Sequence, residues 1–415
     1  MPVEPSRLIG WSTALGHLAS EKDAVITLFE KLGGIGYTDS QFKVRSEDGK
    51  GEYNAYFNHF NPTLHAADGI VRLAQDADLT IKTLQRVQRE FNQILPLYFS
   101  YYSNISTPTD GVFFNPDGVL ELGRNFDVIL EGIKRVGIIN TENSDGLRSS
   151  SIHALYRCPA ELAQLGARVD EVEYYARLVD GEPQIDTTCW NLKTLTPLIF
   201  EKLGDPKLMD LFRELQPYAT KKGQGSGMSL HIQAPLNWPE NHMLYVQNAK
   251  RLAAEHGDKV VAFAKAMHDY GVQFGFSDLA KDYEAAVALV EQSKDLGRFV
   301  DEIGKYGQPE ETSWPNEMGI MAHYESKLGD YATLVNEGLN CQERLVRLAK
   351  GLNERYSFRF TSRGLQGVLR AAITIQKAAG TINVDAVAKN LDTTDKKYRV
   401  ESLSYAVERS QLLVA

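Results

Sequence analysis

Residues 70–95 read IVRLAQDADLTIKTLQRVQREFNQIL, and this stretch decides the fold class. Its apolar side chains recur at spacings of three and four residues: Ile70, Leu73, Ala77, Ile81, Leu84, Val87, Phe91 and Ile94. That period gathers apolar groups on one side of an α-helix, so the stretch predicts one amphipathic helix. Pro96 lacks a backbone donor and should end it.

Similar helical patterns follow along the chain, at 125–136, 159–166, 191–216, 239–268, 277–297, 315–337, 340–352, 362–379, 384–391 and 398–413. Residues 97–123 differ because they are rich in Tyr and Phe and broken by Pro and Gly, which predicts a long ordered loop. Asp180-Gly181 suggests a turn between two strands within 171–188. The fold class predicted is therefore mainly α, with long ordered loops and at most minor β elements. No internal repeat is evident, so we do not expect a solenoid.

The chain has 415 residues, which is enough for two or three hydrophobic cores. Residues 221–229 (KKGQGSGMS) contain three closely spaced glycines and are the best candidate for a linker. We therefore predict an N-terminal, mainly helical lobe over 1–220, which contains the aromatic loop 97–123, and a C-terminal helical lobe over 230–415.

Composition narrows the class of protein. No run of apolar residues is long enough to cross a membrane, and the first residues do not resemble an export signal. The three cysteines, Cys158, Cys189 and Cys341, are far apart and predict neither a disulfide framework nor a zinc site. We expect a cytoplasmic or otherwise intracellular protein without a membrane partner. The net charge of −9 argues against a surface built throughout to hold nucleic acid, but it allows a local basic groove.

Motifs for phosphate loops, nucleophile elbows and zinc proteases are missing from the sequence. His59, His65 and Asp68 could approach one metal if the chain turned at Asn61-Pro62, but their spacing is not that of a known site. Surface or capping histidines explain them as well.

A second set of possible metal ligands comprises His242, His268, Asp269 and Asp330. Two consecutive amphipathic helices, interrupted at His256-Gly257, separate the first two. The set resembles the HD phosphohydrolase superfamily, and the resemblance implies one divalent metal that activates water. The match is incomplete because Val272 stands where a Lys commonly follows the Gly. The alternative is a helical hairpin with solvated His and Asp side chains at its ends.

A basic stretch near the C-terminus predicts contact with nucleic acid, through Arg344, Arg347, Lys350, Arg355, Tyr356, Arg359 and Arg363. Arginines that alternate with aromatic residues can follow a phosphate backbone while rings stack on bases. In an extended segment, the alternation in RYSFRF also places arginines on one side and rings on the other. The alternative is a solvated helix face and a strand with buried rings, whose arginines pair with acids elsewhere.

These features together favour a non-enzymatic structural protein that self-associates into a shell, ring or filament, as viral capsid proteins and nucleoproteins do. Such a homo-oligomer would need no cofactor, could form part of a virion or other particle, and could bind RNA through the basic stretch. We expect the loop 97–123 to lie at a subunit contact, because Tyr and Phe are enriched there. The alternative function is a metal-dependent phosphohydrolase; a regulatory adaptor or secreted effector fits the same features as the first hypothesis.

Overall fold

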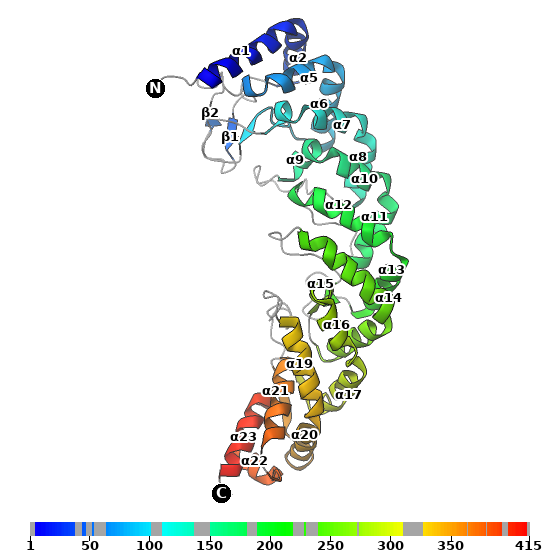
Figure 1. The fold of residues 1–415 in the computed structure, drawn as a ribbon, viewed down its shortest axis with the longest axis vertical. Coiled ribbons are helices and arrows are strands. Elements are labelled where there is room, and N and C mark those ends of the chain that lie inside the picture. Colours follow the sequence, from blue (N-terminus) through cyan, green and yellow to red (C-terminus); the bar gives the residue numbers. More distant parts are fainter. Residues whose placement is uncertain are drawn as a thin grey trace. The chain divides into compact units, whose positions relative to one another are not determined.

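The fold was analysed in a computed structural model of the chain. It describes residues 5–37, 44–46, 52–53, 64–100, 110–136, 150–180, 189–218, 228–229, 240–271, 274–309, 327–362, 364–378, 380–391 and 397–412. In these residues the protein is mainly α-helical with short strands, which confirms the predicted fold class (Figure 1). None of the described helices is both long and apolar enough to cross a membrane.

Internal contacts divide the chain into two compact units. Unit 1 consists of Met1–Ala176 and Pro183–Pro197, and unit 2 consists of Arg177–Glu182 and Leu198–Ala415. This division falls earlier in the chain than the predicted linker at 221–229. Of that linker only Met228–Ser229 are described, so its role stays a prediction.

Unit 1 is built from short helices and one small sheet. The helices are α1 (Pro5–Ser20), α2 (Lys22–Gly34), α5 (Ala67–Gln75), α6 (Ala77–Phe91), the 3-10 turn η2 (Val112–Phe114), α7 (Pro116–Arg124), α8 (Phe126–Val136), α9 (Ser150–Arg157) and α10 (Pro159–Ala167). Helices α11 (Val169–Asp180) and α12 (Cys189–Leu203) each belong partly to unit 2. Strand β1 (Val44–Ser46) pairs antiparallel with β2 (Glu52–Tyr53) and parallel with β3 (Phe99–Ser100).

Unit 2 is also mainly helical. Its helices are α13 (Pro206–Leu215), the 3-10 turn η3 (Gln216–Tyr218), α14 (Glu240–Asp269), α15 (Phe276–Lys281), α16 (Tyr283–Val290), α17 (Ser293–Ile303), α19 (Lys327–Asn340), α20 (Gln342–Tyr356), α21 (Leu365–Lys377), α22 (Val384–Asn390) and α23 (Val400–Leu412). Strand β4 (Met228–Ser229) pairs with β5 (Phe274–Gly275). Strands β6 (Gly307–Pro309), β7 (Arg359–Ser362) and β8 (Lys397–Arg399) form a parallel sheet in that order.

Single residues with non-helical backbone angles separate many consecutive helices. Glu21 divides α1 from α2, Asp76 divides α5 from α6, and Asn125 divides α7 from α8. His256 interrupts α14 in the same way, with φ −137° and ψ 19°, which confirms the predicted interruption there. In each case the next helix begins immediately, so the elements occur as pairs.

The stretch that predicted the fold class shows what such a break does. Instead of one helix over 70–95, the chain forms α5 and α6, because Asp76 adopts φ −118° and ψ 43°. Asn92, in the left-handed region with φ 51°, ends α6 before Pro96 is reached. The apolar period survives the break, since Ile70 and Val87 are both fully buried. Ile94, which the pattern places on the same face, lies beyond the end of α6 and is 37% exposed, so the prediction is wrong for it. The two strands expected within 171–188 are also wrong in part, because α11 runs to Asp180.

Helix pairs stack on their neighbours along the chain. In unit 1, α5 packs on α1 and α2, α7 packs on α5 and α6, and α10 packs on α7 and α8. In unit 2, α14 packs on α13 and α17, α16 packs on α19, and α21 packs on α19 and α20. This serial stacking within each unit resembles the packing of repeat proteins, although no sequence repeat is evident. The sequence conceals it because break residues differ and the connections vary in length.

Candidate functional site

A buried polar cluster in unit 1 joins the start of η2 to the end of α9. Asp110 and His153 are 3% and 4% exposed, and Tyr156 is 1% exposed. The Asn115 amide donates to Asp110 Oδ1 at 2.7 Å, and the Tyr156 hydroxyl lies 3.5 Å from Asp110 Oδ2. Arg157 forms an ion pair with the same carboxylate, and Tyr156 is hydrogen bonded to His153 Nδ1.

The backbone on either side of Gly111 brings Asp110 to this position. Gly111 has φ 114°, and an added Cβ would lie 2.6 Å from the Leu97 carbonyl oxygen, so a larger residue would disrupt the approach. The amides of Val112 and Phe113 donate to the carbonyls of Pro96 and Leu97, at 2.9 and 3.3 Å. These contacts hold the segment before α7 against the chain that follows α6, and Asp110 faces α9 as a result.

Burial shifts the protonation of the cluster. It lowers the pKa of His153 to about 4, so the imidazole is neutral at pH 7. Burial also raises the pKa of Asp110, while hydrogen bonds from Gly111, Asn115 and Tyr156 act in the opposite direction. The Arg157 guanidinium further favours the carboxylate form, because an opposite charge at contact stabilises it. Buried groups with shifted pKa values occur at functional sites but also in structural networks.

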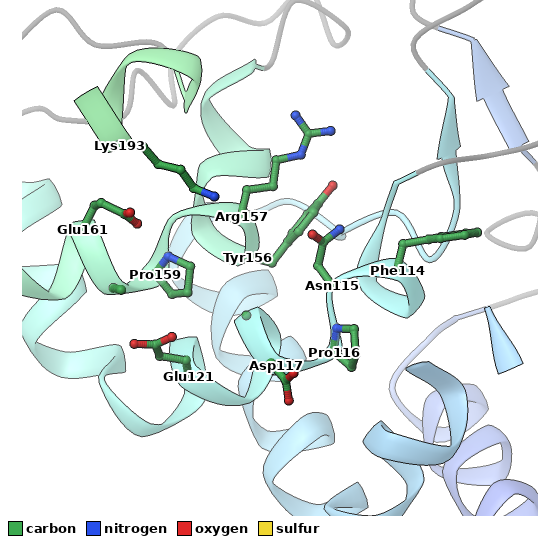
Figure 2. A pocket seen from close by; sticks show the side chains of 12 residues that line it. Phe114, Asn115, Pro116, Asp117, Glu121, Tyr156, Arg157, Pro159, Glu161 and Lys193 are labelled. Carbon is green, nitrogen blue, oxygen red and sulfur yellow. The ribbon is translucent and has the colours of Figure 1, made fainter. Parts of the chain in front are cut away.

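An open pocket of about 410 Å³ lies beside this cluster (Figure 2). It is lined by Phe114, Asn115, Pro116, Asp117, Gly118, Glu121, Tyr156, Arg157, Pro159, Ala160, Glu161 and Lys193. Helices α7 and α10 both begin at it, with Pro116 and Pro159 in their first turns. Arg157 and Lys193 line the pocket together with Glu121 and Glu161, so its charge is mixed. It therefore does not point to one class of ligand.

No short sequence motif indicates this cluster. Asp110 is far from His153, Tyr156 and Arg157 in the chain, and only tertiary packing brings them together. The sequence gives only an indirect indication, which is that Asp110 lies in the loop 97–123 that is predicted to be ordered.

Two aromatic residues of that loop, Tyr98 and Phe113, pack inside unit 1, whereas Phe114 is half-buried and lines the pocket. Tyr98 is 2% exposed and Phe113 is 1% exposed. Their rings lie edge to face with centroids 5.2 Å apart, and the Phe113 ring also contacts Phe29 at 5.9 Å. Tyr98 and Phe113 are thus core residues, and the prediction that such rings form a subunit contact is wrong for them. Tyr101 and Tyr102 lie outside the described residues.

The ligand set that resembles the HD superfamily is brought together only in part. His268 Nδ1 lies 3.5 Å from Asp269 Oδ1 at the end of α14, and Lys265 forms an ion pair with Asp269. His242 is in the first turns of α14, but its side chain is outside the described part, and Asp330 is exposed in the first turn of α19. The metal site stays a prediction.

The earlier pair of histidines also stays apart in what the structure describes. His59 lies outside the described residues, and His65 is exposed. Asp68 instead contacts His17, with 2.7 Å between the carboxylate oxygen and Nδ1. Within the described ranges, no three His, Cys, Asp or Glu side chains are grouped so that they could hold a metal ion.

Several residues of the predicted basic stretch have partners within unit 2. Arg344 donates to the carbonyls of Gln376, Ala378 and Gly380, at 2.8 to 3.2 Å, and so covers the end of α21. Arg355 and the Tyr356 hydroxyl both contact the Asp385 carboxylate, at 3.0 and 2.8 Å.

The remaining members of the stretch have fewer contacts with other helices. Arg347 and Lys350 lie 3.7 and 3.9 Å from Glu343 and Glu354, one helical turn away. Arg359 is exposed in β7 and has no ion-pair partner among the described residues. Arg363 is outside them. The stretch is therefore continuous in sequence but is divided between contacts within unit 2 and exposed cations near single glutamates, and whether it binds nucleic acid stays a prediction.

Comparison with known proteins adds no family to this picture. No protein-family model matches the chain, and neither the curated proteins nor the solved structures contain a significant match. A functional proposal therefore rests on the residues themselves.

Proposed function

We propose that this chain is a non-enzymatic structural protein that self-associates head to tail. The observation that supports the proposal is the serial stacking of helices within each unit: α7 packs on α5, α6 and α10 in unit 1, and α19 packs on α16 and α21 in unit 2. Repeat proteins of this kind need polar faces on their terminal pairs to stay monomeric.

The terminal pairs here expose large apolar side chains. Leu15 on α1 and Ile26 on α2 are each 44% exposed, and these helices form the first pair. Tyr405 on α23, in the last pair, is 59% exposed. Single exposed apolar residues are common on monomers, and inner helices of this chain carry them too, Leu244 on α14 among them. The proposed contact uses Leu15, Ile26 and Tyr405 because α1, α2 and α23 come first and last in the order in which the described helices pack. A second copy of the chain can cover both ends by continuing the stack.

A contact between two different ends of the chain is heterologous. Two copies joined in this way still have one free end each, so further copies can add. Such contacts produce rings if the rotation closes and filaments if it does not. A ring or filament is among the assemblies expected from the sequence. The proposed subunit contact differs from the one predicted there, because it is formed by α1, α2 and α23 and not by the loop 97–123.

The decisive experiment compares variants blocked at one end. Light scattering during size exclusion should show masses above that of the 46.4 kDa chain, and these masses should rise with protein concentration. Leu15→Glu with Ile26→Glu should block one end, and Tyr405→Glu should block the other, so each variant alone should be monomeric. An equimolar mixture should form dimers and nothing larger, because one intact end remains on each partner.

Leu244→Glu is the matched control, since Leu244 is 53% exposed but lies on α14, within the stack. It should assemble as the unchanged chain does. A chain that stays monomeric at all concentrations, or variants that assemble normally, would show the proposal to be wrong.

A further inference from the structure

A repeated ion pair joins successive helix pairs of unit 1. The second helices of these pairs are α2, α6, α8 and α11, and the second residue of each is an aspartate: Asp23, Asp78, Asp127 and Asp170. The tenth residue of α2, α6 and α8 is a cation, and each cation pairs with the aspartate of the next helix in this series: Lys31 with Asp78, Arg86 with Asp127, and Arg135 with Asp170. These three ion pairs form a ladder.

The ladder is visible only in the structure. The helices that carry it begin at Lys22, Ala77, Phe126 and Val169, so the intervals between them differ and the ladder has no fixed sequence period. It stops at α11, whose tenth residue is Leu178.

The first position of the ladder is vacant. Asp23 is exposed and has no ion-pair partner among the described residues, in which α1 and α2 are the first helix pair. Leu15 on α1, six residues before the break at Glu21, is 44% exposed. Its counterparts six residues before the breaks in the next three pairs are core residues, at most 1% exposed: Ile70, Val119 and Leu162. The first pair therefore presents both an acid and an apolar residue whose counterparts are covered by packing.

Helix α23, the last described helix, repeats the pattern of α8. Buried residues occupy the same five positions in both helices: Phe126, Ile129, Gly132, Ile133 and Val136 in α8, and Val400, Leu403, Ala406, Val407 and Ser410 in α23. The tenth residue of α23 is Arg409, as the tenth residue of α8 is Arg135. Arg409 therefore occupies the position from which the ladder cations reach the next helix pair.

Arg409 is available for such a contact. It is exposed and has no carboxylate partner among the described residues. Its guanidinium lies 5.0 Å from the centroid of the Tyr405 ring. A ring contact of this kind is compatible with an ion pair, because Arg86 lies over the Phe126 ring and also pairs with Asp127.

We propose that Arg409 of one copy pairs with Asp23 of the next copy, so that the contact between copies repeats the ladder of unit 1. This inference rests on the proposed head-to-tail association and names the residues that set its register. Exposed ion pairs contribute little to affinity, but opposite charges fix the register of a contact and like charges exclude the wrong one. Leu15 and its neighbours supply the apolar part of the contact.

Charge reversal in the full chain tests the proposal, with particle mass followed by light scattering at low salt. Asp23→Arg and Arg409→Asp each bring like charges together, so each variant alone should need roughly fivefold to tenfold more protein to assemble. An equimolar mixture should assemble as the unchanged chain does, because both ends are basic in one variant and acidic in the other. The chain with both substitutions should also assemble normally. Salt at about 1 M should reduce the differences, because exposed charges are screened.

Asp258→Arg is the matched control, because Asp258 is exposed and follows the break at His256 by two residues, as Asp23 follows Glu21. It should assemble as the unchanged chain does, and circular dichroism should show the same melting temperature for all variants. Normal assembly of the single reversals, no recovery in the mixture, or an equal effect of Asp258→Arg would overturn the ladder contact while leaving self-association in place. An unchanged chain that stays monomeric would overturn both proposals.

Discussion

Replacing Asp110 by Asn tests whether the buried cluster holds unit 1 together. The substitution removes the charge that balances Arg157, which is itself mostly buried, with 16% of its side chain exposed. Removing one partner of a buried ion pair costs about 3–5 kcal/mol, because the other charge is left in a poorly solvated place. The free energy of unfolding of unit 1 should fall by at least about 3 kcal/mol, which lowers the melting temperature of a unit of this size by roughly 6–12 °C.

Asp78→Asn is the control for the same chemical change at the surface. Asp78 pairs with Lys31, their side chains are 94% and 40% exposed, and exposed pairs contribute about 0–1 kcal/mol. Thermal melting followed by circular dichroism measures both variants, and hydrogen exchange locates the change. Exchange should accelerate in α7 and α9 for Asp110→Asn and remain as before in unit 2. Equal melting temperatures for the two variants would refute the structural role assigned to the cluster.

Two further predictions concern the same part of unit 1. Burial lowers the pKa of His153 from 6.5 to about 4, so its contribution to stability is complete above pH 6.5 and is lost as pH falls from 6.5 towards 4. Urea unfolding should show a loss of about 2–3 kcal/mol between pH 7 and pH 4.5 that His153→Gln reduces, and an unchanged pH dependence in this variant would contradict the assignment. Gly118→Ala should destabilise unit 1 by about 3 kcal/mol, because the added Cβ would lie 1.8 Å from the Tyr156 carbonyl oxygen. Gly297→Ala on α17 is the control, because nothing lies within 4 Å of the added Cβ. It should raise the free energy of unfolding by up to about 1 kcal/mol in the thermal melting assay. Equal effects of Gly118→Ala and Gly297→Ala would show that α7 and α9 can separate freely.

The helices predicted from the sequence agree best with the structure where the spacing of apolar residues is the only evidence needed. Ile70 and Val87 were assigned to one buried face, and both are buried, because a period of three to four residues has the same consequence whichever neighbour covers the face. The break at Asp76 was missed, since a single residue can leave the helical region without disturbing that period. The interruption of the helix at His256 can be predicted only because a glycine, Gly257, follows it.

The candidate sites depended far more on partners distant in sequence. Arg344 and Arg359 look alike in the sequence, yet the first covers the end of α21 and the second faces solvent. What separates them is the set of backbone carbonyls of Gln376, Ala378 and Gly380, which Arg344 on α20 meets only after α21 has packed. Charge density along the chain could therefore locate a basic stretch but could not say which cations remain free.

Sequence by itself determined the mainly helical class, because that follows from local periodicity, but it left buried rings at Phe358 and Phe360 as one of two alternatives. Tertiary structure alone decided that helix pairs stack in series, that Tyr98 and Phe113 are core residues, and that Asp110 meets His153, Tyr156 and Arg157. The physical reason is that an amphipathic pattern indicates that one face of a helix will be buried, but it does not indicate which part of the chain will cover that face. A buried polar group is satisfied by whichever partner the packing brings within hydrogen-bonding distance.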